Sequence, residues 1–164
     1  MKKLTLIRHA KSSWEHDVID HQRPLKKRGF NDAHIVSKCL KSINKQFELI
    51  VSSDAKRTKT TAQIFMANLN IEEGSLTFNH DLYDFSGEKL IEVIKNCDDS
   101  INNLMIFGHN YALTSFVNTF GSEYIENVPT SGVVIIQFNI ENWKALKKGE
   151  TLKTIFPRDL KNQL

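Results

Sequence analysis

The stretch KKLTLIRHAK (residues 2–11) places a short apolar run directly before an arginine, a histidine and a lysine. Residues 4–7 have the length and composition of a buried strand. In an open α/β sheet, ligands bind just beyond the carboxyl ends of the strands. Arg8 can hold a phosphate through its planar fork of N–H donors, and a neutral imidazole at His9 can attack phosphorus. Alone, this pair is weak evidence, because many loops contain both residues.

Further apolar runs alternate with amphipathic segments along the chain. We expect strands at residues 4–7, 47–51, 76–78, 103–107, 133–138 and 152–156, and helices at residues 25–43, 56–67, 88–95 and 112–120. This alternation is typical of an α/β fold, here a three-layer sandwich in which helices flank a mostly parallel central sheet. The polar tail, residues 158–164, is expected to fray. The length predicts one domain spanning residues 1–164.

The composition is that of an ordinary globular protein, with 40% hydrophobic residues and a formal net charge of +3. Such a mild charge suits an anionic ligand but is too small to indicate nucleic-acid binding. Cys39 and Cys97 lack the spacing of a metal or redox site. No apolar run is long enough for a signal peptide or a membrane span, so we expect a cytoplasmic protein with neither nucleic acid nor membrane as a partner.

Polar residues suited to anions follow three of the predicted strands. Residues 8–9 follow the first strand, SSDAKR (residues 52–57) follows the second, and GHN (residues 108–110) follows the third. Because the carboxyl ends of parallel strands share one edge of a sheet, these segments should converge. A single arginine or histidine is more often structural, but their recurrence at three strand ends favours an oxyanion site.

The second of these segments also begins a predicted helix. Ser53 or Asp54 is expected to cap that helix, and Arg57 lies in its first turn, close to the positive end of the helix dipole. A helix N-terminus with an arginine beside it is a natural site for an oxyanion.

Taken together, the motifs resemble the histidine phosphatase superfamily, also called phosphoglycerate mutase-like. The matching segments are RHAKS (8–12), SDAKRTKTTA (53–62), LY (82–83) and GHN (108–110), and the stretch DHQRPLKKRGFNDA (20–33) is similar to the small SixA-like branch of phosphohistidine phosphatases. Two positions depart from the superfamily's usual pattern, Ala10 in place of glycine and Tyr111 in place of proline. Neither change removes a charged group.

The resemblance implies a role for each matching residue. His9 would be the catalytic nucleophile that becomes phosphorylated. Arg8, Arg57 and His109 would bind the phosphate, with His109 also part of the catalytic set, and Arg23 would line the rim. These cations would take the role that a divalent ion has elsewhere, so a metal-independent phosphatase with no cofactor is expected.

Asp84, which follows the Leu82-Tyr83 motif, has two possible roles that the sequence leaves equally open. It could be the general acid that protonates a leaving group, which would require a raised pKa. It could instead be a loop aspartate or a helix cap ahead of Ser86.

The expected substrate follows from the space available around the site. Between Tyr83 and Gly108 there is room for one helix and one strand and no inserted cap, and a bare pocket admits a side chain presented by another protein. A protein phosphohistidine, such as that of a phosphotransfer domain, is therefore favoured as substrate and partner. The alternatives are a phosphatase for small phosphorylated molecules and a non-catalytic phosphate-binding module.

Overall fold

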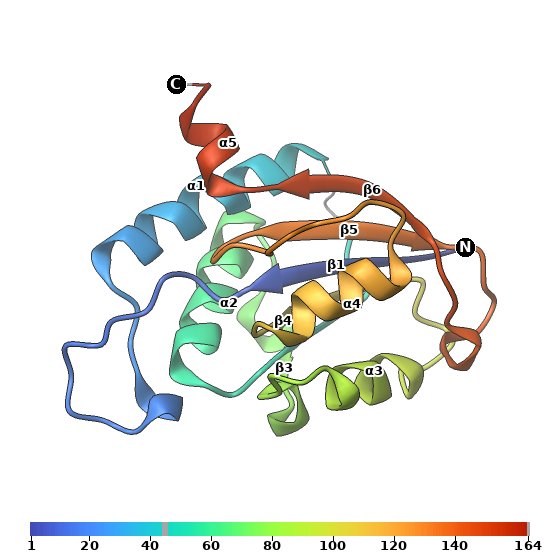
Figure 1. Cartoon of the computed structure of the whole chain (residues 1–164), viewed down its shortest axis with the longest axis horizontal. Coiled ribbons are helices and arrows are strands. Elements are labelled where there is room, and N and C mark those ends of the chain that lie inside the picture. Colours follow the sequence, from blue (N-terminus) through green and yellow to red (C-terminus); the bar gives the residue numbers. More distant parts are fainter. Residues whose placement is uncertain (44–45, 164) are drawn as a thin grey trace.

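The computed structural model describes residues 1–43 and 46–163, and Figure 1 shows their arrangement around one central sheet. The sheet has six strands in the order β3-β2-β4-β1-β5-β6. Strands β1, β2, β3 and β4 run parallel, whereas β5 runs antiparallel to both of its neighbours. The strands are β1 (Lys2–Arg8), β2 (Leu49–Ser52), β3 (Leu76–Phe78), β4 (Asn103–Gly108), β5 (Val133–Phe138) and β6 (Glu150–Ile155).

Helices cover both faces of this sheet (Figure 1). One face packs against α3 (Glu88–Lys95) and α4 (Ala112–Phe120), and the other packs against α1 (Lys27–Ile43), α2 (Lys56–Asn68) and α5 (Pro157–Lys161). Alternate residues of each strand enter the two cores: in β4, Leu104 and Ile106 enter the first, and Met105 and Phe107 enter the second. This confirms the predicted α/β sandwich with a mostly parallel sheet.

Short 3-10 turns complete the chain and carry residues of the site. They are η1 (Asp20–Gln22), η2 (Glu73–Ser75), η3 (His80–Leu82) and η4 (Trp143–Ala145). None of the helices within residues 1–43 and 46–163 is long and apolar enough to cross a membrane.

The predicted elements agree closely with the observed ones. Helices α3 and α4 and strands β3 and β5 have the expected bounds, and the other predicted elements differ by one or two residues at one or both ends. The prediction that residues 158–164 fray is wrong for residues 158–161, which belong to α5 (Pro157–Lys161), while Leu164 lies outside the described residues. Leu160 packs in the core beside α1, and Lys161 pairs with the buried Asp32 of α1, so tertiary contacts hold this short helix.

Candidate functional site

The carboxyl ends of β1, β4 and β2 lie side by side, because β4 pairs with both of the other strands. Backbone hydrogen bonds continue the pairing past the strand ends: the His9 N–H donates to the Gly108 carbonyl, and the Ser53 N–H donates to the Phe107 carbonyl. The three polar segments predicted from the sequence therefore converge. Ser131, at a positive φ of 62°, joins them through its backbone N–H, which donates to the carbonyls of Arg8 and His9.

His9 is buried, and its hydrogen bonds fix which ring nitrogen is free. Nδ1 lies 2.7 Å from the Ala10 carbonyl oxygen, and because a carbonyl can only accept, Nδ1 carries the proton. Nε2 therefore holds a lone pair, which accepts from the Arg57 Nε–H at 3.4 Å. Burial, followed by the neighbouring His109, Arg57 and Arg8, holds the pKa of His9 well below 6.5 despite the opposing effect of the Ala10 bond. The ring is thus uncharged at neutral pH, with a free lone pair on Nε2.

Arg57, in the first turn of α2, is almost fully buried and is held by Asp20. Its Nη1 donates to the Asp20 carbonyl at 2.8 Å, and its Nη2 donates to the Asp20 carboxylate at 3.0 Å. The Tyr83 hydroxyl donates to the same carboxylate oxygen. Asp20 therefore sets the plane of the guanidinium, which leaves its Nε edge toward His9. Asp20 was predicted only as part of the SixA-like segment, and its contact with Arg57 was not predicted.

His109 packs beside His9, with the two ring centroids 5.2 Å apart. Its Nε2 lies 2.8 Å from the Ser53 hydroxyl oxygen and 3.3 Å from that of Thr58. Burial, followed by the charge of Arg57, lowers the pKa of His109 to about 3, so it is also neutral. Its Nδ1 is buried without a hydrogen-bond partner among the described residues.

The other two predicted arginines complete the cationic surroundings. Arg8 donates to the Val128 carbonyl at 2.9 Å, and burial, then the charge of Arg57, lowers its pKa. Arg23, also buried, bonds the Ser12 hydroxyl, pairs with Asp20 at 3.5 Å and stacks at 3.4 Å on the exposed ring of Trp14. The structure thus gathers His9, Arg8, Arg57 and His109 at one point and places Arg23 beside them.

Asp84 has the environment of a helix cap, the second of the two roles that the sequence leaves open for it. Its carboxylate accepts bonds from the Ser86 N–H and hydroxyl and from the N–H groups of Gly87 and Leu90, at the start of α3. Burial acts to raise the pKa of Asp84, but these four bonds outweigh it and lower the pKa. A carboxyl held ionised in this way stabilises the helix start.

The prediction that Ser53 or Asp54 caps α2 is also wrong. Ala55 is the capping residue and supplies no side-chain bond. Ser53 instead contacts His109, and its hydroxyl also accepts from the Ala55 N–H at 3.2 Å. Asp54 turns toward His21 and His80, forming the one group of metal-type side chains identified among the described residues.

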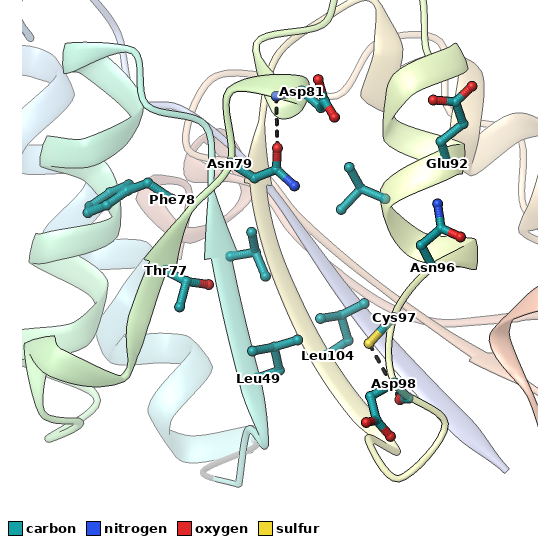
Figure 2. A pocket seen from close by; sticks show the side chains of 12 residues that line it. Leu49, Thr77, Phe78, Asn79, Asp81, Glu92, Asn96, Cys97, Asp98 and Leu104 are labelled. Carbon is teal, nitrogen blue, oxygen red and sulfur yellow. Dashed lines mark hydrogen bonds between the residues drawn. The ribbon is translucent and has the colours of Figure 1, made fainter.

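A separate pocket lies between β3 and α3, and Figure 2 shows the side chains around it. It has a volume of about 360 Å³ and is lined on the sheet side by Leu49, Val51 and Leu104. Asp81 and Glu92 lie at its edge, and it contains none of the strand-end cations or histidines. The strand-end cations and histidines therefore form a site distinct from this pocket.

Comparisons with known proteins agree with this geometry. The family model of the histidine phosphatase superfamily (branch 1) matches residues 4–89. An uncharacterized chloroplastic protein of Arabidopsis thaliana is 36% identical over 118 residues, which are 66% of this chain and 54% of that protein. This chain therefore spans about half the length of that relative.

Two solved structures illustrate the shared fold. The structure of the protein histidine phosphatase SixA complexed with tungstate superposes with a TM-score of 0.77 at 16% identity, over 96% of this chain and 99% of that one. A phosphoserine phosphatase from Entamoeba histolytica, in complex with 3-phosphoglyceric acid, superposes with a TM-score of 0.60 at 15% identity, over 94% and 96% of the two chains. These likenesses show the phosphoglycerate mutase-like fold. With the family match over more than half of its length, the chain belongs to the histidine phosphatase superfamily.

Proposed function

We propose that this protein is a phosphatase that transfers a phosphoryl group to Nε2 of His9 and then hydrolyses the phosphohistidine with water. The observation that carries the proposal is the state of His9: Nδ1 is protonated and fixed by Ala10, while Nε2 presents a lone pair beside the Arg57 guanidinium. In the first step, Nε2 forms a bond to phosphorus as the bond to the leaving group breaks. In the second, water attacks phosphorus and returns the electron pair to Nε2.

The cations supply the electrostatic part of this mechanism. Charge develops on the equatorial oxygens of a transferring phosphoryl group, and fixed donors aimed at those oxygens lower the barrier. Arg57 and Arg8 are held by Asp20 and Val128, so little reorganisation is needed when the phosphoryl group arrives. His109 adds a neutral donor, because its unpartnered nitrogen can carry the proton toward an oxyanion. The proposed chemistry needs no metal ion in the phosphate pocket.

A protein phosphohistidine is the substrate class that the site favours. The two carboxyls considered as an acid, Asp20, which bonds Arg57, and Asp84, both have lowered pKa values and are ionised at neutral pH. In Asp20, burial acts in the opposite direction, and the bonds from Tyr83 and Arg57 outweigh it. An alkyl phosphate needs a strong acid to protonate its leaving oxygen, whereas an imidazole can leave already protonated. The part of the chain between Tyr83 and β4 is occupied by α3 and its loops, with no inserted cap over the pocket.

A small-molecule phosphomonoesterase is the second candidate. It is favoured by the fold, which this chain shares with a phosphoserine phosphatase. A phosphate-binding module without catalysis is the third, and it would need the arginines but not a free Nε2 on His9.

The test is a rapid-quench experiment with a radiolabelled protein phosphohistidine and, in parallel, a panel of phosphomonoesters. We expect an acid-labile label on the wild type, none on His9→Asn, and full labelling of His34→Asn, a control at an exposed histidine. Release from phosphohistidine should exceed release from every monoester. Faster release from a monoester would support the second candidate, and absence of label from every donor would support the binding module.

A further inference from the structure

Three metal-type side chains from three separate segments meet beside the phosphate pocket. His21 comes from η1, Asp54 from the loop between β2 and α2, and His80 from the start of η3. The His21 Nε2 lies 2.9 Å from the Asp54 carboxylate, and the His80 Nδ1 lies 3.0 Å from both of its oxygens. One nitrogen of each ring and one carboxylate oxygen lie within 4.8 Å of one another. This cluster takes no part in the chemistry proposed for His9.

The donor set matches the preference of one class of cation. Two imidazole nitrogens and one carboxylate oxygen, with a fourth position left to water, are the ligands of many Zn²⁺ sites. Bond lengths of about 2.0–2.1 Å in a tetrahedral site place neighbouring donors about 3.4 Å apart. The observed separations of the two nitrogens from Asp54, 2.9 and 3.0 Å, need to open by a few tenths of an ångström, and the two nitrogens, which lie within 4.8 Å of each other, would have to settle at the same spacing. The side chain of His80, 71% exposed, can move freely to do so.

The surroundings of His21 support the same interpretation. Metal-binding histidines usually use their second ring nitrogen to hold a hydrogen-bond partner, which fixes the ring. The Nδ1 of His21 lies 2.9 Å from the side-chain amide of Gln22, and an amide can present either its oxygen or its nitrogen to that atom. Tyr83 also packs edge-on against the ring, with centroids 5.0 Å apart. His21 is thus held in place independently of Asp54.

We propose that His21, Asp54 and His80 bind one divalent transition-metal ion of the Zn²⁺ type, with water as the fourth ligand. The ion would join three segments that form the wall of the phosphate pocket. Asp20, next to His21, holds Arg57, and Tyr83, just after η3, contacts the same carboxylate. Its role is to fix this wall rather than to act on phosphorus.

The direct test is a Co²⁺ titration of untagged, chelator-treated full-length protein. We expect the visible absorption of four-coordinate Co²⁺ to appear with a stoichiometry of one and to be displaced by Zn²⁺. His80→Ala and Asp54→Asn should weaken binding by more than about tenfold, and Gln22→Ala by about tenfold. His16→Ala and His34→Ala alter exposed histidines outside the cluster and should bind as the wild type does.

Thermal unfolding gives a second readout, because an ion that binds only the folded state raises Tm. Zn²⁺ should raise the Tm of the wild type and of His34→Ala, but not that of His80→Ala, whose exposed position makes it the variant least expected to disturb folding. If the wild type shows neither four-coordinate Co²⁺ nor a Zn²⁺-dependent shift, or if the cluster variants bind as tightly as the controls, the three side chains form only a hydrogen-bonded group and the proposal fails. Both readouts are independent of phosphatase activity.

Discussion

A single hydrogen bond decides which ring nitrogen of His9 carries the proton. The Ala10 carbonyl accepts from Nδ1, and the backbone of Ala10 is itself held, because its N–H donates to the Thr61 hydroxyl at 2.9 Å. That hydroxyl donates in turn to the Arg57 carbonyl at 2.7 Å. The Thr61 side chain therefore holds the backbone beside His9 and that of Arg57 together.

The lowered pKa of His9 predicts activity at acid pH. An ordinary histidine nucleophile loses about tenfold in rate for each pH unit below about 6.5, because its protonated form cannot attack. Since burial and nearby cations keep His9 neutral below that pH, its kcat/KM should stay level as the pH falls from about 7 to about 5. A pH profile of phosphoenzyme formation checks this, and a decline centred near pH 6.5 would contradict it.

Arg57 should not tolerate replacement by lysine. Arg57→Lys keeps the charge but loses the fork that meets Asp20 and the Nε–H that faces His9. We expect kcat/KM to fall by about 100- to 1000-fold, the usual loss for one transition-state donor. The exposed arginine of α5 provides the control, and Arg158→Lys should retain wild-type kinetics. Equal activity of both variants would show that Arg57 acts only through its charge.

Among the individual residues of the site, those that could be predicted from the sequence are charged or imidazole side chains that lie at the end of a predicted strand or the start of a predicted helix. His9, Arg8, Arg57 and His109 each follow a strand or begin a helix, and the fold brings them together. Asp84 was harder, because a carboxylate after a turn can be an acid or a cap, and only the four bonds around it decide. The cluster of His21, Asp54 and His80 was missed, because its members belong to unrelated loops.

Asp84 organises an element, the start of α3. Asp84→Asn leaves one oxygen to accept bonds that two oxygens now share, and we expect a loss of about 1–3 kcal/mol in the free energy of unfolding. Phosphoenzyme formation should be nearly unchanged. Urea unfolding measures the difference, with Asp17→Asn, at an exposed loop position, as the control.

The difference in the free energy of unfolding between wild type and Asp84→Asn should depend on pH in a defined direction. The pKa of Asp84 is lowered in the folded protein, so its stabilising effect is complete above the unfolded value of about 3.9 and disappears as the pH falls through the folded value. The gap between wild type and Asp84→Asn should therefore be constant near neutral pH and close only in strong acid. The helix-cap role would be contradicted if the two proteins became equally stable already near pH 6, or if Asp84→Asn lost catalytic activity without losing stability. Either result would indicate that Asp84 acts as a general acid.

Helix α1 depends on a glycine that allows close contact with the segment after His9. A Cβ added at Gly29 would overlap the carbonyl oxygen of Lys11, whereas one added at Gly74 would meet nothing within 4 Å. We expect Gly29→Ala to lower stability by about 1–3 kcal/mol or more, since the backbone must move, and Gly74→Ala to leave it nearly unchanged. Thermal unfolding of the pair tests this, and equal Tm values would mean that α1 can shift without loss.

Most elements could be predicted because their apolar residues recur at the period of a strand or a helix. In β5, residues 133–138 form an almost unbroken apolar run between turns, as expected for a strand buried on both faces. Helix α5 gave no such signal, because its five residues are too few for a helical period. It forms because Pro157 begins it and the core beside α1 covers Leu160.

For the whole molecule, the order of the strands creates the site. Strands β1 and β2 are not neighbours, and β4 between them brings Arg8, His9, Ser53 and His109 together. The sequence predicted convergence at one edge of the sheet but not this order, because strand pairing depends on contacts between distant segments.

Two neutral buried histidines should make the whole protein less stable in acid. The pKa values of His9 and His109 are lowered in the folded state, so the unfolded chain binds more protons below about pH 6.5, and stability falls as the pH falls. Each histidine lowers the free energy of unfolding by up to about 1.4 kcal/mol for each pH unit below about 6.5. For His109 this loss continues until the pH reaches its folded pKa of about 3. Urea unfolding between about pH 7 and about pH 5 should show a smaller slope for His109→Gln than for wild type. His34→Gln should keep the wild-type slope.

The carboxylate of Asp20 has a consequence for which molecules can approach. It lies between Arg57 and Tyr83 with its side chain 43% exposed, so the entrance carries a negative charge outside an interior of positive ones. A compound with a second acidic group close to its phosphate meets repulsion there, whereas a leaving group that bears a positive charge is attracted. The Asp20 carboxylate should therefore favour phosphorylated compounds whose leaving group is positively charged over those whose leaving group is negatively charged. Added salt should weaken this preference, because it screens the charge.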